Sequence, residues 1–138
     1  MKNNDQILNL FENYLAQMQF PEEPELLYKP ILYSMSGGGK RIRPTLLMLA
    51  CEAFGGDVQQ ALPAAAAVEM FHNFTLLHDD IMDNAEVRRG KPSVYASWGD
   101  NVAILSGDAM MIYSYRLLSE VPADKLARIM EIFTTTAL

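Results

Sequence analysis

Three carboxylates fall within five residues in the segment His78-Asp79-Asp80-Ile81-Met82-Asp83, and Arg88 and Arg89 follow closely. On a helix, Asp79 and Asp83 lie four residues apart and share one face, where like charges repel unless a cation lies between them. Carboxylate oxygens with no cysteine nearby favour magnesium over zinc. The two arginines provide fork-shaped donors that match phosphate. The segment therefore predicts a Mg²⁺-dependent grip on a diphosphate.

A second cluster is formed by residues 37–44, which read Gly-Gly-Gly-Lys-Arg-Ile-Arg-Pro. Glycines allow a backbone to adopt positive φ angles and to approach a ligand closely. At the start of a helix, Lys40 and Arg43 can face the same way, and the free amides there favour an anion. The alternative is a flexible linker followed by solvated charges. The glycine and lysine spacing of the Walker phosphate loop is absent.

Helices must position both clusters, because the apolar residues repeat with a helical period and no segment has a strand pattern. The composition agrees, since half of the residues are hydrophobic and Ala, Leu and Met are plentiful. Pro21, Pro24 and the glycine pairs mark breaks. We expect helices over about 5–19, 24–35, 44–54, 60–84, 93–98, 101–120 and from 122 onward, with a loop over 85–92.

The remaining sequence features limit the class of protein. A chain of 138 residues allows one domain, and a formal charge of −6 argues against a nucleic-acid partner. No stretch has the length and apolar character of a membrane span. The single cysteine, Cys51, and an N-terminus without a secretory pattern predict a cytoplasmic protein. Because the last helix stops without a cap, we expect the chain to be the N-terminal portion of a longer one.

Three motifs in order, GGKRIRP, VEMFHNFTLLHDDIMD and VRRGKPSV, resemble the trans-type isoprenyl (polyprenyl) diphosphate synthases over roughly residues 38–92. The resemblance implies an all-α, antiparallel helix bundle, of which residues 1–138 would be the N-terminal part of a single domain. It also implies a prenyltransferase that uses Mg²⁺ to ionise an allylic diphosphate, which isopentenyl diphosphate then attacks. In this family a homodimer is the expected assembly.

The resemblance also implies residue roles. Asp79 and Asp83 would bind the metal, with Asp80 as a weaker ligand or a partner of the ligands, because it lies about 100° around the helix from Asp79. Arg88 would contact the allylic diphosphate, and Arg89 the isopentenyl diphosphate. The rest of the isopentenyl diphosphate site would be Lys40, Arg43 and His72, and Lys40 and Arg88 would act in catalysis with the aspartates.

The helical wheel gives independent support for His72, which precedes Asp79 by seven residues and lies about 20° off the same face. His78 and Arg41 are expected to be packing or supporting groups instead. For Asp108, a structural and a functional role stay open. We expect Met110 and its apolar neighbours on that helix to form core or a subunit contact.

Two further expectations concern what the chain makes. Phe74, five residues before Asp79, would form the floor that limits product length, giving a farnesyl or geranylgeranyl product; ordinary core packing is the alternative. The family's second aspartate-rich motif is absent after Asp83, so the 138-residue chain alone is expected to be inactive. Alternatives are a non-catalytic diphosphate-binding subunit and, against the GGKR and RRG motifs, a class I terpene cyclase.

Overall fold

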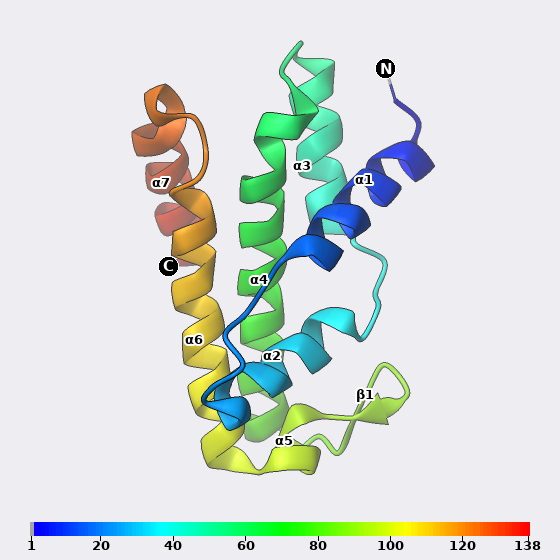
Figure 1. The fold of residues 1–138 in the computed structure, drawn as a ribbon, viewed down its shortest axis with the longest axis vertical. Coiled ribbons are helices and arrows are strands. Elements are labelled where there is room, and N and C mark those ends of the chain that lie inside the picture. Colours follow the sequence, from blue (N-terminus) through cyan, green and yellow to red (C-terminus); the bar gives the residue numbers. More distant parts are fainter. Residues whose placement is uncertain (1) are drawn as a thin grey trace.

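The computed structural model describes residues 2–138, and these form seven α-helices and one small hairpin (Figure 1). The helices are α1 (Asn4–Gln17), α2 (Glu25–Ser36), α3 (Ile42–Ala53), α4 (Val58–Met82), α5 (Val94–Trp98), α6 (Asp100–Leu118) and α7 (Ala123–Ala137). The all-α prediction is confirmed, and each predicted helix boundary lies within two residues of the observed one.

The hairpin corrects one expectation, because the segment 85–92 is more than a loop. Strands β1 (Val87–Arg88) and β2 (Lys91–Pro92) pair antiparallel, with Val87 opposite Pro92 and Arg88 opposite Lys91. Arg89 (φ 53°) and Gly90 (φ 75°) form the turn between them. Two residues per strand are too few to show the alternation by which a strand is recognised in a sequence.

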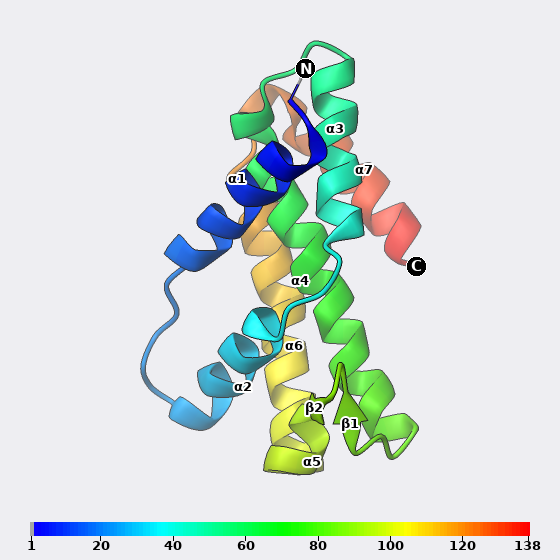
Figure 2. The same ribbon diagram turned by 90° about the vertical axis from the view of Figure 1, so that its right-hand side faces the viewer.

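Helix α4 is the centre of the bundle (Figures 1 and 2). Helix α6 packs antiparallel along one side of it and α3 along another, while α1 and α2 cross its front. The Asp57 side chain caps the N-terminus of α4 by accepting a hydrogen bond from the Gln59 amide at 2.9 Å. The α4 C-terminus, which carries the aspartates, lies beside the hairpin (Figure 2).

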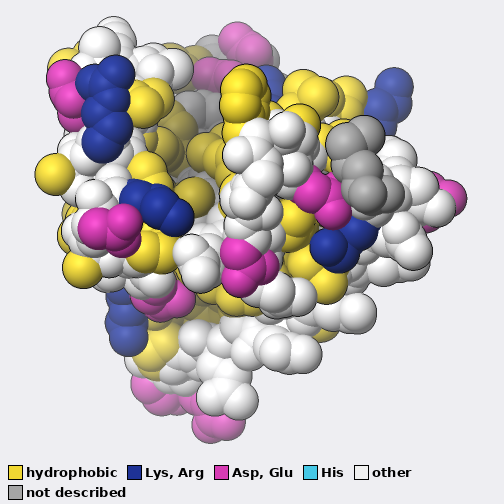
Figure 3. Space-filling view, turned by 90° about the horizontal axis from the view of Figure 1, so that it is seen from above, with side chains coloured by type: hydrophobic (Ala, Val, Ile, Leu, Met, Phe, Trp, Pro, Cys, Tyr) yellow, Lys and Arg dark blue, Asp and Glu magenta, His cyan; other side chains and the backbone are white. Residues whose placement is uncertain are grey.

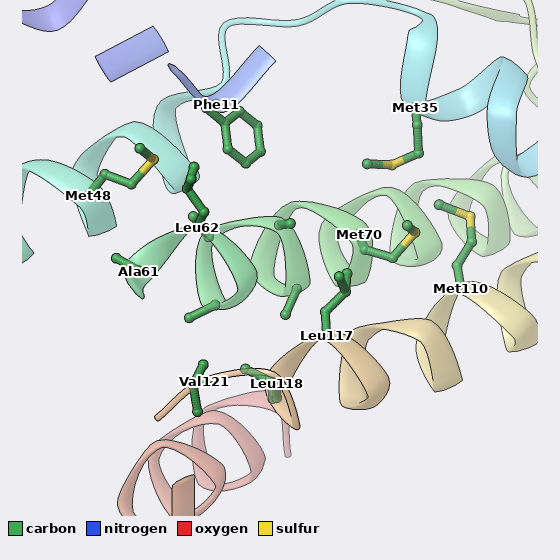
Figure 4. Close-up of a cluster of buried hydrophobic side chains, with 14 of the residues drawn as sticks. Phe11, Met35, Met48, Ala61, Leu62, Met70, Met110, Leu117, Leu118 and Val121 are labelled. Atoms are coloured by element: carbon green, nitrogen blue, oxygen red, sulfur yellow. The ribbon is translucent and has the colours of Figure 1, made fainter. Parts of the chain in front are cut away.

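The core lies on both sides of α4 (Figure 4). Phe11 and Met48 cover one side, and Met110 and Leu117 of α6 cover the other. Met70 and Met110 are fully buried, and each such side chain contributes about 1.5–3 kcal/mol by leaving water. A run of buried alanines, residues 64–67, keeps α4 slim enough to be surrounded in this way.

Close packing between α4 and α6 requires Gly107, because a Cβ atom there would lie 2.5 Å from Nε2 of His78. The same nitrogen lies 3.2 Å from the carbonyl oxygen of Ile104 and 3.7 Å from the Asp108 carboxylate. His78 therefore packs against α6, as expected. Within residues 2–138, no helix has both the length and the apolar surface needed to cross a bilayer.

Candidate functional site

Asp79 and Asp83 are exposed on the last turn of α4. The Asp83 amide donates a hydrogen bond to the Asp79 carbonyl oxygen at 2.8 Å, so helical geometry persists through the pair and both residues remain on one face. The two carboxylates are thus available to a ligand without any rearrangement of the core.

Asp80, between them, has a different environment, since it is 2% exposed and is paired with Arg88 of β1. Arg88 donates from Nη2 to Oδ1 at 2.7 Å and from Nε to both carboxylate oxygens at 2.9 Å. This hydrogen bond is the main reason that the pKa of Arg88 is raised, and the charges of Asp79 and Asp83 add to it. Asp80 therefore holds Arg88 beside the two exposed aspartates.

The hairpin that carries Arg88 is fixed to the bundle by hydroxyl groups. Ser93 donates to the Ala85 carbonyl oxygen at 2.6 Å and accepts from the Ala96 amide at 3.0 Å, which caps α5. The Tyr33 hydroxyl donates to the Pro92 carbonyl oxygen at 2.8 Å. The Tyr33 ring also packs edge-on against Trp98, with the centroids 5.1 Å apart. These contacts hold the arginine turn in one position relative to α4.

The glycine-rich segment between α2 and α3 meets this hairpin. Arg89 donates from Nη1 to the Gly38 carbonyl oxygen at 2.5 Å. Gly38 and Gly39 have φ angles of 75° and 138°, and a Cβ atom on Gly39 would lie 3.1 Å from Cζ of Arg89. Burial and the charge of Arg41 lower the pKa of Arg89. The glycines therefore let the two basic segments come together, which a generic flexible linker would not require.

Arg43 and His72 lie close to each other, where α3 passes the middle of α4. Burial lowers the pKa of His72, and the positive charges of Arg43, Arg89 and Arg88 lower it further, although Glu69 opposes them. His72 is thus held in its neutral form among cationic groups. A diphosphate brought to this place would offset the clustered positive charge.

A largely apolar cavity of about 740 Å³ begins at Arg43 and His72 and extends between α3, α4 and α7. Its wall on α4 is formed by residues at helical spacing: Gln60, Ala61, Ala64, Val68, Phe71, His72 and Thr75. Asp79 follows Thr75 by four residues, so the aspartate face continues directly into the cavity wall. Seen from above, at the end of the molecule away from the aspartates, hydrophobic side chains are exposed among charged ones (Figure 3). The candidate site therefore joins a charged end to an apolar cavity.

The positions of the predicted residues follow from this geometry. Asp79, Asp83 and Arg88 lie together, and Arg43, His72 and Arg89 form the neighbouring basic group. Lys40 is exposed on the glycine-rich segment. Phe74 does not line the cavity; its ring packs against Phe71 and His78, with centroids 5.1 and 4.9 Å away. Its role as a floor stays a prediction.

Behind the basic segment lies a buried polar group, in which Arg41 has the supporting role expected of it, while its partners could not be named from the sequence. Arg41 is 4% exposed and Glu69 is 3% exposed, and they are hydrogen bonded at 2.7 Å. Burial alone would lower the pKa of Arg41, but its hydrogen bonds to Glu69 and Glu12 raise it overall. The partners are separated by 28 and 29 residues along the chain, so no local pattern connects them.

The arrangement of the aspartates fits Mg²⁺ that is bound jointly by protein and substrate, and it does not fit a metal site made of protein ligands alone. In residues 2–138, no group of three His, Cys, Asp or Glu side chains is arranged to hold a metal ion. Magnesium usually binds through one or two carboxylates together with substrate phosphates and waters. Two exposed carboxylates on one helical face, open to a phosphate ligand, meet that requirement.

Comparisons with known proteins give a consistent result. The family model described as polyprenyl synthetase matches residues 24–138. A geranylgeranyl diphosphate synthase of Methanosarcina mazei is 46% identical over 115 residues, which is 82% of this chain and 36% of the relative. A farnesyl diphosphate synthase of Geobacillus stearothermophilus is 43% identical over 107 residues, which is 76% of this chain and 36% of the relative. A crystal structure of a geranylgeranyl pyrophosphate synthase superposes with a TM-score of 0.95 at 44% identity, over 99% of this chain and 42% of that one. The chain thus spans about a third of the length of these curated relatives.

Proposed function

Because this chain belongs to the polyprenyl synthetase family, we propose that it forms part of a prenyltransferase that condenses isopentenyl diphosphate with an allylic diphosphate. The observation that carries the proposal is the continuity of one α4 face. Asp79 lies at its polar end, His72 lies next to Arg43, and Ala61 and Ala64 line its apolar end. Such a face suits a substrate with an anionic head and a hydrocarbon tail.

The roles of the side chains follow from their charges and positions. Arg88, held by Asp80, binds the allylic diphosphate. Asp79 and Asp83 would hold Mg²⁺, which would supply positive charge to neutralise the diphosphate as a leaving group. Lys40, Arg43, His72 and Arg89 bind the second diphosphate. After the allylic C–O bond breaks and diphosphate leaves, the double bond of isopentenyl diphosphate attacks the allylic carbon, and loss of a proton completes the longer allylic product. Water must be excluded meanwhile, which the apolar cavity favours.

The cavity and the relatives support a short product. Phe71 of α4 and Phe133 of α7 both line the cavity. Their rings pack edge-to-face, with the centroids 5.2 Å apart. On α4, the wall also includes the small residues Ala64 and Ala61. We infer a farnesyl or geranylgeranyl product, in line with the names of the relatives.

The assembly is inferred from helix α6. Met110 and Leu117 are buried in the core, whereas Leu105 and Ile112 are about 60% exposed on another face of the helix. An exposed apolar face of this kind suits a second copy of the chain, and we propose a homodimer. Sedimentation of the full-length protein, with Ile112→Glu as the variant expected to dissociate it, tests this assembly.

Neither alternative function gains support, since the relatives described above are named as diphosphate synthases. No second aspartate-rich motif occurs between residues 84 and 138, so the carboxylates of this chain offer only one wall for the metal. We therefore expect the isolated 138-residue chain to show no measurable condensation.

Turnover of the full-length protein tests the proposal. It is incubated with isopentenyl diphosphate and geranyl or farnesyl diphosphate, with and without Mg²⁺, and the products are separated by chain length. We expect products one or two isoprene units longer that depend on Mg²⁺. Cyclised hydrocarbons formed from the allylic substrate alone would favour the cyclase, and absence of any product would favour the non-catalytic subunit.

A further inference from the structure

Arg41 lies between two residues assigned to the substrate, Lys40 and Arg43, yet its side chain is the only one of the three that is buried. Its backbone is left-handed, with φ 45° and ψ 35°, and it is the N-cap residue of α3. The Thr45 amide donates to its carbonyl oxygen at 3.1 Å. A left-handed conformation is unfavourable for a residue with a side chain, so surrounding contacts must hold it.

Those contacts come from three helices. The Arg41 guanidinium donates from Nη1 to Oε1 of Glu69 on α4 at 2.7 Å and from Nε to Oε1 of Glu12 on α1 at 2.9 Å. It also donates from Nη2 to the carbonyl oxygen of Met35 on α2 at 2.6 Å. All three guanidinium nitrogens are therefore engaged, and none points toward the basic group at the site.

Glu69 is itself fixed by its own helix. Asn73 donates from Nδ2 to the Glu69 carbonyl oxygen at 2.8 Å and to Oε1 at 3.4 Å. Glu69 precedes His72 by three residues, so the two lie within one turn of α4. The bond between Arg41 and Glu69 consequently joins the start of α3 to the turn of α4 that carries His72.

We propose that the Arg41–Glu69 pair is a positioning element that sets the distance between the basic segment and α4, so that Arg43 lies beside His72. The proposal rests on the function proposed above. Arg41 turns inward with a left-handed backbone, whereas Lys40 and Arg43 of the same segment are exposed. A planar guanidinium fixes direction as well as distance, which explains an arginine here.

The competing explanation is that the pair only stabilises the fold. Breaking a buried ion pair by removing one partner leaves an uncompensated charge and destabilises any protein. The informative variants therefore keep the shape and remove the charge from both partners, as in Arg41→Gln with Glu69→Gln. Glu69→Gln alone keeps an acceptor for Arg41 and is the variant expected to fold best.

The experiment measures KM for each substrate of the full-length protein, after circular dichroism has shown that the variants are folded. We expect Arg41→Gln/Glu69→Gln to raise KM for isopentenyl diphosphate about tenfold and to change KM for the allylic substrate less than twofold. Glu69→Gln should give a smaller change of the same kind. The control is Glu25→Gln/Lys29→Gln, which removes an exposed pair on α2 and should change neither constant.

The proposal would be overturned by a folded double variant in which neither KM value changes, and also by one in which both KM values rise by the same factor. If the wild-type protein shows no turnover, the proposed function fails first. Titration with inorganic pyrophosphate by calorimetry then still tests the positioning. Binding at least fivefold weaker in Glu69→Gln than in wild type would support it, and equal binding would contradict it.

Discussion

The two ends of the α4 face are built differently. At the polar end, buried ion pairs fix the side chains: Asp80 holds Arg88, and Glu69 holds Arg41. At the apolar end, the cavity is bounded by α7, which has no buried residue along its whole length. In the proposed function, the polar end would therefore specify the position of the diphosphate groups closely, and the apolar end would leave space for the hydrocarbon.

The two ends differ because ion pairs and hydrogen bonds depend on direction, whereas apolar contacts do not. A buried charge is tolerated only when it is paired and hydrogen bonded, so each buried carboxylate determines where its arginine lies. Apolar contacts have no direction, and they tolerate side chains of different shape as long as water is excluded. We therefore expect substitutions at the polar end to change rates and those at the apolar end to change the product.

The largest effect should follow from Asp79→Ala or Asp83→Ala in the full-length protein. Each removes one exposed carboxylate that neutralises developing charge, and the loss of one such interaction typically lowers kcat by about 10²–10³-fold. Helical circular dichroism and Tm should remain near wild type, because neither side chain is buried. Asp5→Ala, an exposed acid on α1, is the control. Near-normal turnover in either variant would remove the metal assignment.

Asp80→Asn should have a smaller effect on rate and a larger one on stability. Hydrogen bonds to charged groups contribute about 1.5–3 kcal/mol, and the lower part of this range applies because Arg88 is partly exposed. We expect Tm to fall by a few degrees and turnover to fall about tenfold. If activity fell as far as in Asp79→Ala while Tm stayed constant, Asp80 would be a metal ligand instead.

At the apolar end, Phe71→Ala and Phe74→Ala distinguish a cavity wall from core packing. Phe71 lines the cavity, so its truncation should lengthen the product by at least one isoprene unit. Phe74 packs behind it, between the rings of Phe71 and His78. Longer products from Phe74→Ala would confirm its predicted role as a floor. A lower Tm with unchanged product length would show that it is core.

The same contrast explains what the sequence could predict. The helical period of α4 is a local property, and it correctly gave the helix, the shared face of Asp79 and Asp83, and the separate direction of Asp80. The small residues Ala61 and Ala64 indicated only helix, because a cavity depends on what α3 and α7 place opposite them. The packing of His78 was expected, but its close contact with Gly107 was not.

The ion pairs could not be predicted because their partners are distant in sequence. Arg88 reaches Asp80 only because the hairpin of residues 87–92 reverses the chain, and two residues in each strand leave no pattern. Arg41 is set apart in its motif as a packing or supporting group, but the sequence indicates no partner for it. Its partners on α1, α2 and α4 are known only once the helices are packed.

The smallest expected effect is a change in the protonation of His72, measured by NMR titration. Burial and Arg43 hold its pKa below the ordinary value of about 6.5, so Arg43→Gln should raise the pKa part of the way back. Pyrophosphate with Mg²⁺ should raise it too, because added negative charge favours the imidazolium. Only two histidines are present, and His78→Gln identifies the signal.

The lowered pKa of His72 also determines how the stability of the folded protein changes with pH. Because the neutral form of His72 is favoured in the folded state, the unfolded chain takes up its proton first as pH falls through about 6.5. This residue therefore makes the folded protein less stable below that pH, and Arg43→Gln should reduce the loss. If the pKa of His72 were unchanged in Arg43→Gln, the two side chains would not share one site. The polar and apolar ends of the α4 face would then no longer be connected by the Arg43–His72 pair.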